Sequence, residues 1–257
     1  MSVYNGTCWG NGTACDKALV IYDGNTQPMN ITHRGFDIAY ENITGRDDQL
    51  ALIVYQNQTN NASYRIWNST NRSLSAPKQV APAFNDGSYV SWIQLVPMSD
   101  EAGNNEIALL MAHDNSTTLS ASVYNSTNTS FGCNATITTV LDFGGLPRWK
   151  SFDAEYMRGN KTLFVVAGLQ GLFIATANKS LGNCDWKVSG LIQVQERGSV
   201  LSTGADEYNP NANKTCIAIH SVTQNDEVNY MYFKNSSLEN SSNDQAASGN
   251  PGSPRHL

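Results

Sequence analysis

Asparagines that open N-glycosylation sequons are the residues with the most distinctive chemistry in this chain. The sequence holds 29 asparagines, and 17 of them begin an Asn-x-Ser/Thr triplet with a non-proline middle residue. Chance would make roughly one asparagine in five or six a sequon at this Ser/Thr content, so the excess indicates selection for attached glycans. The alternative is that Asn, Ser and Thr serve only as turn-forming residues. The acceptors are Asn5, Asn11, Asn30, Asn42, Asn57, Asn61, Asn68, Asn71, Asn115, Asn125, Asn128, Asn134, Asn160, Asn178, Asn213, Asn235 and Asn240.

Acidic residues on predicted first strands make the best case for an enzyme. In a propeller these strands line the central channel, where a glycosidase would place its paired carboxylates. The candidates are Asp37, Asp153, Glu155, Asp206 and Glu207. However, Asp37 and Asp153 recur at equivalent repeat positions, and a residue present in each copy is better explained by a turn or backbone amide that it holds. We therefore expect no enzymatic activity and no catalytic residues, with a propeller glycosidase as the less favoured alternative.

Other reactive groups lack the spacing of a catalytic or metal site. His113 and His220 close equivalent predicted strands, which indicates a structural role rather than a general base or metal pair. The segment 180–186 occupies the place of the aspartate box in sialidase-type propellers but has different residues. An acidic turn fits no strong calcium loop; its oxygen-bearing residues are Asp100, Asn104, Asn105 and Glu106. We expect no cofactor and no bound metal.

The five cysteines predict disulfides rather than a zinc site. They form no Cys-x-x-Cys pair, and no histidine lies at a zinc-ligand spacing. In an oxidising compartment Cys8 and Cys15 are expected to close a short loop, and two of Cys133, Cys184 and Cys216 to pair, leaving one over. The spacing does not fix the connectivity.

Composition restricts the partners and the location. Charged residues make up 15% of the chain and the net charge is −6, so it lacks the basic surface of a nucleic-acid-binding protein. The longest apolar runs, such as residues 50–55, have strand length and are far shorter than the roughly twenty residues of a membrane-spanning helix. Glycosylation requires a secretory route, so we expect an extracellular or cell-surface protein, present here as a mature form or a fragment of a longer precursor.

An internal repeat predicts the architecture. The sequence RGFDIAYE at residues 34–41 is echoed by KSFDAEY at 150–156. Between and after these segments lie related units that begin with different residues, which gives an alternating A-B-A-B pattern. The expected units are 34–87 (A1), 88–147 (B1), 148–198 (A2) and 199–234 (B2, incomplete).

Each unit is expected to form one antiparallel sheet. It contains a short first strand, an apolar second strand and an aromatic third strand, and most units add a weaker fourth. The predicted second strands are 50–55, 107–112, 163–167 and 216–219, all apolar on both faces. The third strands end at Asn68, Asn125, Asn178 and Asn235. We predict an all-β fold of four blade-like sheets resembling a β-propeller, with two packed β-sandwiches completed by strand exchange as the alternative.

The two ends of the chain do not match the middle. Residues 1–33 resemble the end of a B unit, because Ser2-Val3-Tyr4-Asn5 parallels Ser122-Val123-Tyr124-Asn125. Unit B2 is expected to lack its fourth strand, and residues 235–257 read as a polar tail or linker. The segment 18–22 is expected to complete a sheet in its own molecule, which gives a monomer, or in a neighbouring subunit, which gives a head-to-tail filament.

At these residues the chain resembles a tandem repeat of large, mostly uncharacterised prokaryotic surface proteins. That repeat alternates a unit of the form Arg-x-Phe-Asp-x-Ala-Tyr-Glu, followed by an apolar strand and Tyr-Arg-x-Trp-Asn, with a Trp-led unit. Residues 34–41, 50–55 and 64–68 match the first unit, and Trp92, 106–112 and 123–125 match the second. The second A-B pair departs from the pattern: the Trp67 position has no aromatic counterpart near Ala177. The resemblance implies an extracellular repeat protein and brings no site residues with it.

Together these observations predict a heavily N-glycosylated extracellular structural protein. We expect its partners to be covalent N-glycans and copies of itself, assembled into a filament or layer by strand addition. The alternative is a secreted monomeric propeller that binds carbohydrate or protein.

Overall fold

All the regular structure described in this protein is β-strand. The computed structural model describes residues 35–40, 50–56, 62–80, 90–99, 105–113, 118–126, 128–138, 152–157, 161–168, 171–188, 192–198, 201–205, 217–222, 228–234 and 237–239. Within these ranges there are four antiparallel sheets, each built from a continuous stretch of the chain. The predicted all-β class is therefore confirmed.

The first two sheets take up the N-terminal half of the described chain. The first sheet has the order β1-β2-β3-β4, with β5 also paired to β3; its strands are β1 (Phe36–Tyr40), β2 (Leu50–Gln56), β3 (Ala62–Asn68), β4 (Ser73–Leu74) and β5 (Lys78–Gln79). The second sheet has the order β6-β7-β8-β9; its strands are β6 (Val90–Ser99), β7 (Asn105–His113), β8 (Thr118–Asn125) and β9 (Ser130–Thr138).

The remaining two sheets repeat this plan. The third sheet has the order β10-β11-β12-β13, with β14 also paired to β12; its strands are β10 (Phe152–Met157), β11 (Thr162–Gly168), β12 (Gly171–Ser180), β13 (Trp186–Val188) and β14 (Ile192–Gly198). The fourth sheet has the order β15-β16-β17-β18; its strands are β15 (Leu201–Ala205), β16 (Ile217–Val222), β17 (Val228–Lys234) and β18 (Ser237–Glu239).

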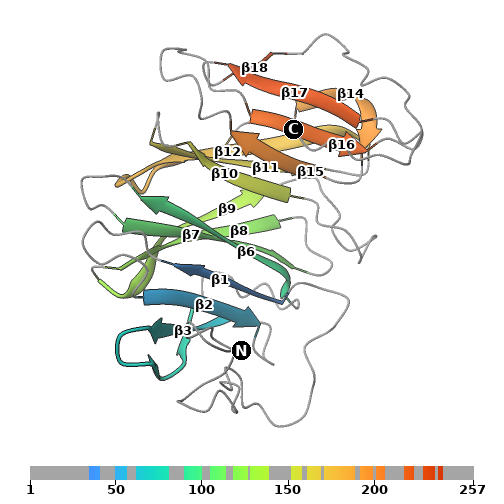
Figure 1. Cartoon of the computed structure of the whole chain (residues 1–257). Coiled ribbons are helices and arrows are strands. Elements are labelled where there is room, and N and C mark those ends of the chain that lie inside the picture. Colours follow the sequence, from blue (N-terminus) through green and yellow to red (C-terminus); the bar gives the residue numbers. More distant parts are fainter. Residues whose placement is uncertain are drawn as a thin grey trace, which may run out of the picture.

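The sheets stack in chain order like the blades of a propeller. Figure 1 shows the blue first sheet and the orange-red fourth sheet at opposite ends of the stack. The first strand of each sheet contacts the first strand of the next, β1 with β6, β6 with β10 and β10 with β15. Consecutive sheets joined along their first strands are the arrangement of propeller blades, with those strands nearest the axis.

The middle of the stack shows why the β-sandwich alternative is wrong. Alternate side chains of β7 enter two different cores, because successive residues of a strand point to opposite faces. Ile107, Leu109 and Met111 pack with the first sheet, and Ala108, Leu110 and Ala112 pack with the third. A sheet buried on both faces belongs to a stack of blades, whereas a sandwich would bury only one.

The fourth sheet corrects the expectation of an incomplete last unit. A short strand, β18, pairs with the end of β17 through Phe233 and Leu238, so the sheet has a fourth strand of its own. The segment was expected to be a tail because it is polar and lacks an apolar pattern. Backbone pairing of a three-residue edge strand does not depend on apolar side chains, which explains the difference. The expected joining segment 18–22, and residues 1–33 as a whole, lie outside the described residues.

Candidate functional site

The acidic residues expected near the propeller axis hold one strand to the next. Asp37 on β1 accepts a hydrogen bond at Oδ2 from the backbone N–H of Leu95 on β6 (2.8 Å), and at Oδ1 from the N–H of Ile38 (3.0 Å). Asp153 on β10 accepts one at Oδ1 from the side-chain Nε2 of Gln94, also on β6 (2.8 Å). The two equivalent carboxylates therefore accept hydrogen bonds from two consecutive residues of β6, Gln94 and Leu95.

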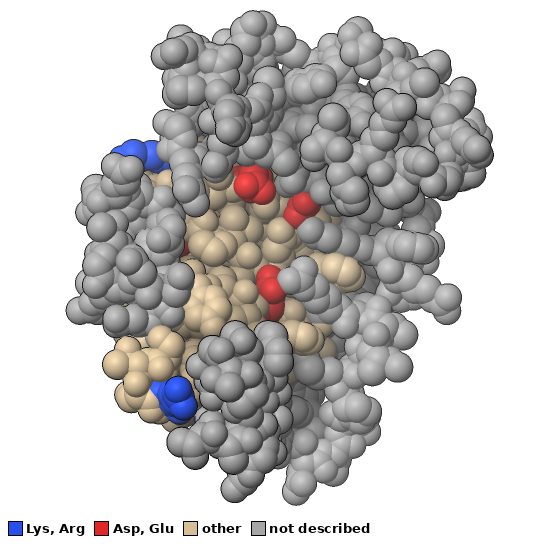
Figure 2. Space-filling model, viewed as in Figure 1, with Lys and Arg blue, Asp and Glu red and all other residues tan. Residues whose placement is uncertain are grey.

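This arrangement agrees with the structural interpretation of the repeated aspartates. Asp37 holds a backbone amide, as expected, whereas Asp153 holds an amide side chain instead. Asp153 is 7% exposed and Glu155 is partly buried. In the view of Figure 2, the acidic side chains of described residues form separate patches among uncharged ones. Asp206 and Glu207 lie outside the described residues.

His113 is a core residue. Its side chain is fully buried, and the Ser120 hydroxyl lies 3.3 Å from His113 Nε2. His220 lies within β16, opposite Ser202 of β15. The burial of His113 at the end of β7 agrees with the predicted structural role, whereas His220 lies two residues before the end of β16 rather than at its end. Within the described ranges, no group of three or more His, Cys, Asp or Glu side chains is placed to hold a metal ion.

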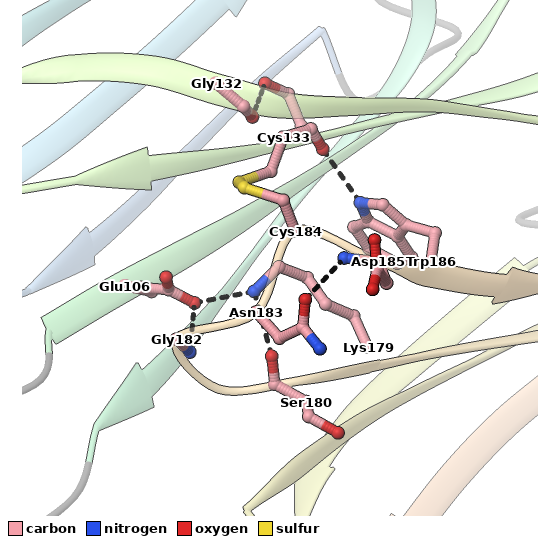
Figure 3. A network of polar contacts seen from close by, with 11 residues as sticks. Glu106, Gly132, Cys133, Lys179, Ser180, Gly182, Asn183, Cys184, Asp185 and Trp186 are labelled. Carbon is pink, nitrogen blue, oxygen red and sulfur yellow. Dashed lines mark hydrogen bonds and ion pairs between the residues drawn. A yellow bond between two sulfur atoms is a disulfide. The ribbon is translucent and has the colours of Figure 1, made fainter.

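A covalent and polar link joins the second sheet to the third (Figure 3). Cys133 on β9 forms a disulfide with Cys184, in the connection between β12 and β13. The indole Nε1–H of Trp186 donates to the carbonyl oxygen of Cys133 (2.8 Å). The expectation that two of the three later cysteines pair is thus confirmed. Cys216 and the expected Cys8–Cys15 pair lie outside the described residues.

A buried ion pair lies beside this disulfide. Lys179 Nζ is 2.7 Å from Glu106 Oε2, and the lysine and glutamate side chains are 0% and 9% exposed. Lys179 also donates to the carbonyl oxygen of Ser180 (3.1 Å), and the N–H of Gly182 donates to Glu106 Oε2 (3.3 Å). Glu106 is therefore part of the contact between sheets rather than of an exposed calcium-binding turn. Sequence reasoning missed this pair because nothing in the local sequence relates residues 73 positions apart.

The segment 180–186 has a structural task in place of an aspartate box. It connects the third and fourth strands of its sheet, β12 and β13, as the sequence predicted. Gly182 adopts a left-handed backbone (φ 74°), which an L side chain rarely adopts and which turns the chain toward Glu106. Asn183 Oδ1 accepts from the N–H of Asp185 (3.0 Å), which shapes the remaining turn.

The described sequon asparagines lie at strand ends, in turns and at one bulge. Asn68 closes β3 and Asn125 closes β8, as predicted, while β12 continues two residues beyond Asn178. The side chains of Asn71 and Asn128 are exposed in the turns that follow β3 and β8. Asn134 is exposed on β9, where its Oδ1 lies 2.7 Å from the Ser122 hydroxyl. The other eleven sequon asparagines lie outside the described residues.

The turn asparagines shape their turns through the side-chain oxygen Oδ1. Asn68 Oδ1 accepts hydrogen bonds from the N–H groups of Thr70 (2.9 Å) and Asn71 (3.2 Å). Asn125 Oδ1 accepts from the N–H of Asn128 (3.3 Å). A glycan would attach to Nδ2, so shaping the turn and carrying a sugar are compatible roles.

Two large aromatic side chains on β1 are exposed. Phe36 is 50% exposed and Tyr40 is 41% exposed; among the described residues the other large apolar side chain with comparable exposure is Val188 on β13, at 45%. Phe36 and Tyr40 lie four residues apart, so they share one face of the strand with Ile38 between them. At about 3.3 Å per residue, the rings are spaced by about 13 Å along the strand.

Membrane insertion by helices finds no support in the described part of the chain, since it contains no helix long and apolar enough to cross a bilayer.

Comparison with known proteins gives likenesses of architecture. No family model and no curated protein matches the chain. Among solved structures, it is similar to the six-bladed β-propeller lectin of the fungus Aleuria aurantia, with 12% identity and a TM-score of 0.47 over 74% of this chain and 55% of the lectin. It is also similar to AofleA of Arthrobotrys oligospora (11% identity, TM-score 0.46, 80% of this chain and 59% of that one). A third is the catalytic domain of a GH62 α-L-arabinofuranosidase of Coprinopsis cinerea (10% identity, TM-score 0.41, 79% and 64%). The chain thus spans less than two thirds of the length of each of these proteins.

Proposed function

We propose that this protein is an extracellular, N-glycosylated and non-catalytic module that binds carbohydrate. The observation that carries the proposal is the pair of exposed aromatic rings, Phe36 and Tyr40, on the strand nearest the axis of the stack. Sugar rings present flat C–H faces that pack on aromatic side chains, and Tyr adds a hydroxyl for hydrogen bonding. A spacing of about 13 Å suits successive units of an oligosaccharide better than one sugar.

The non-catalytic part of the proposal is supported by how the axial carboxylates are used. Asp37 and Asp153 accept hydrogen bonds from β6 at 2.8 Å. A glycosidase needs two carboxyl groups facing a shared space about 5–10 Å wide. Asp37 and Asp153 instead hold neighbouring strands together, so they do not suit the role of paired catalytic carboxylates.

The extracellular part is supported by the disulfide and the sequons. Cys133–Cys184 joins two sheets across 51 residues, and structural disulfides persist in oxidising compartments. Exposed asparagines such as Asn71 and Asn128 follow strand ends, where a bulky glycan would meet solvent.

Filament assembly by strand addition receives less support than binding does. That route needs an open edge on the fourth sheet, but β18 occupies part of the edge of β17. We therefore favour carbohydrate binding over filament assembly, and the test below includes a measurement that would detect assembly.

The test is glycan binding by the secreted, glycosylated chain. The chain would be applied to an array of glycans that includes fucosylated oligosaccharides. Affinity for any glycan bound would then be measured by calorimetry for the double variant Phe36→Ala/Tyr40→Ala and for the matched control Val188→Ala, which removes an equally exposed apolar side chain from another sheet.

The expected result is binding by the native chain and by Val188→Ala, with loss of binding by the double variant. Absence of binding to every glycan, or unchanged affinity in the double variant, would overturn the assignment. Light scattering on the same samples would show any assembly into polymers.

A further inference from the structure

The outermost strand of the second sheet is longer than most of the outermost strands of the other sheets. β9 has nine residues and pairs with β8, and no described strand lies on its other side. In the other sheets, β4, β5, β13 and β18 have two or three residues, and β14 pairs irregularly with β12. An outermost strand presents a row of backbone N–H and C=O groups that another chain can pair with, and a longer strand presents a longer row.

β9 also lacks the charged residues that commonly protect such an edge. A charged side chain on an outermost strand disfavours pairing, because a second strand would take that charge away from water. Outermost strands of the other sheets carry such residues: Lys78 on β5, Lys187 on β13, Glu196 and Arg197 on β14, and Glu239 on β18. The sequence of β9 is SFGCNATIT, with no charged residue and no proline. A strand of this length and composition is prone to edge-to-edge association.

A bulge and contacts with the third sheet protect the first part of β9. Cys133 has a left-handed backbone (φ 52°) where the pairing of β9 with β8 is irregular, and a bulge of this kind interrupts an edge. The same residue forms the disulfide with Cys184, and its carbonyl oxygen accepts from Trp186 (Figure 3). Beyond this point the pairing is regular, with residues 135–138 opposite residues 118–121. The regular segment 135–138 therefore needs another form of protection.

The sequon of Asn134 lies where that protection is needed. Asn134 and Thr136, the acceptor and the hydroxyl residue of the triplet, are both exposed, and they share one face of β9 because alternate residues of a strand point the same way. The side-chain oxygen of Asn134 lies 2.7 Å from the hydroxyl of Ser122, which is fully buried. This contact anchors the base of the Asn134 side chain against the sheet, immediately before the regular segment.

We propose that Asn134 carries an N-glycan whose role is to block the addition of a strand from a second copy of this chain to β9. An added strand would lie about 4.8 Å from β9 and would place a side chain about 5 Å from Asn134. A bulky, solubilising glycan on Asn134 would occupy that position. The glycan thus does for β9 what charged residues do for the outermost strands of the other sheets. This inference rests on the N-glycosylation in the proposed function and is independent of carbohydrate binding.

The test compares the secreted native chain with two variants of the sequon and one control. Thr136→Ala removes the sequon and keeps Asn134, whereas Thr136→Lys removes the sequon and places a charge on β9. Thr70→Ala is the matched control, because it removes the sequon of Asn68 at the end of β3. Mass spectrometry would measure glycan occupancy, light scattering over a range of concentrations would measure molecular mass, and hydrogen exchange would locate any contact between copies.

We expect a glycan on Asn134 of the native chain and the mass of a monomer. Thr136→Ala should form dimers or larger species as its concentration rises, and hydrogen exchange of residues 134–138 should slow as they form. Alanine has a lower strand propensity than threonine, so the substitution by itself does not favour pairing. Thr136→Lys should stay monomeric because lysine protects the edge, and Thr70→Ala should stay monomeric because β9 keeps its glycan.

Several results would overturn this inference. An unmodified Asn134 beside glycans on other sequons would do so and would leave the N-glycosylation of the proposed function intact, whereas a native chain without any glycan would overturn both. A native chain that already associates through residues 134–138 would also overturn it. So would a monomeric Thr136→Ala, association of Thr136→Ala without slower exchange in β9, or equal association of Thr70→Ala.

If Thr136→Ala is not secreted, a second measurement decides. The glycans of the native chain and of Thr136→Lys would be trimmed enzymatically after folding. The proposal expects the trimmed native chain to associate through residues 134–138 and the trimmed Thr136→Lys to stay monomeric. The same mass for both trimmed proteins would refute it.

Discussion

Lys179 and Glu106 form an ion pair of 2.7 Å across the boundary between the second and third sheets, where both side chains are buried. The pair lies beside the disulfide of Cys133 and Cys184, so this boundary has a covalent and an ionic connection at one place (Figure 3). Breaking a buried pair by removing one partner is costly because the other charge loses its compensation in a medium of low polarity.

Substitution of Glu106 by Gln should therefore destabilise the protein. The unpaired ammonium group of Lys179 would remain buried, and the free energy of unfolding should fall by about 3–5 kcal/mol. Urea denaturation of the native chain and the variant would measure this. The double variant Glu106→Leu/Lys179→Met removes both charges and should lose less stability than Glu106→Gln; a double variant that is the less stable of the two would contradict the role given to the pair.

Loss of the Cys133–Cys184 disulfide should also lower stability. The bond closes a loop with a sequence separation of 51, and loop-closure entropy gives it a contribution of about 4 kcal/mol. The variant Cys133→Ser/Cys184→Ser should lose that amount in urea denaturation. A reductant should weaken the native chain and have little effect on the variant; an equal effect on both would assign the redox sensitivity to other cysteines.

Removal of the Asp37 carboxylate should loosen the contact between β1 and β6. Asp37→Ala eliminates the acceptor for the Leu95 N–H, and a hydrogen bond to a charged group contributes about 1.5–3 kcal/mol. Asp37→Asn keeps an acceptor oxygen and should recover part of the loss. The control is Asp185→Ala, which removes an exposed carboxylate. Equal stability of Asp37→Ala and Asp185→Ala in thermal denaturation would show that the bond to Leu95 contributes nothing.

Stability should fall at alkaline pH because of Tyr64. Burial raises the pKa of Tyr64 above its ordinary value of 10.0, so the unfolded chain loses this proton at a lower pH than the folded chain does. The stabilisation is present below pH 10 and is lost as the pH rises past 10 toward the folded-state pKa. Tyr64→Phe cannot ionise and should show a shallower decline of the unfolding free energy above pH 10. Parallel declines in the two proteins would disprove the assignment.

Asn68 allows glycan attachment and turn formation to be separated. Asn68→Gln removes both the sequon and the side-chain bonds to the N–H groups of Thr70 and Asn71. Thr70→Ala removes the sequon and keeps Asn68. Mass spectrometry of the secreted protein should show loss of the same glycan in both variants, while thermal denaturation of enzymatically deglycosylated samples should show Asn68→Gln as the less stable. An unmodified Asn68 in the native chain would remove this residue from the glycan acceptors.

The order and type of the strands could be predicted from the sequence because they depend on local patterns. The repeated Phe-Asp segments predicted β1 and β10, and the apolar run 107–112 predicted a strand that is buried on both faces. Asn68 and Asn125 marked strand ends because asparagine favours turns through its own side-chain bonds. Equivalence of Asp37 and Asp153 within the repeat was enough to indicate a structural role.

Contacts between sheets were decided by the tertiary structure alone. Three cysteines allowed several pairings, and only the approach of β9 to the connection before β13 selects Cys133 and Cys184. Nothing in the sequence around Glu106 or Lys179 indicates that these two residues pair. Their contact follows from the stacking of the second and third sheets. β18 is paired by its backbone, and its three residues, Ser237, Leu238 and Glu239, form no apolar pattern that would reveal a strand. Local preference depends on neighbours in the sequence, whereas these contacts depend on which faces and edges meet in space.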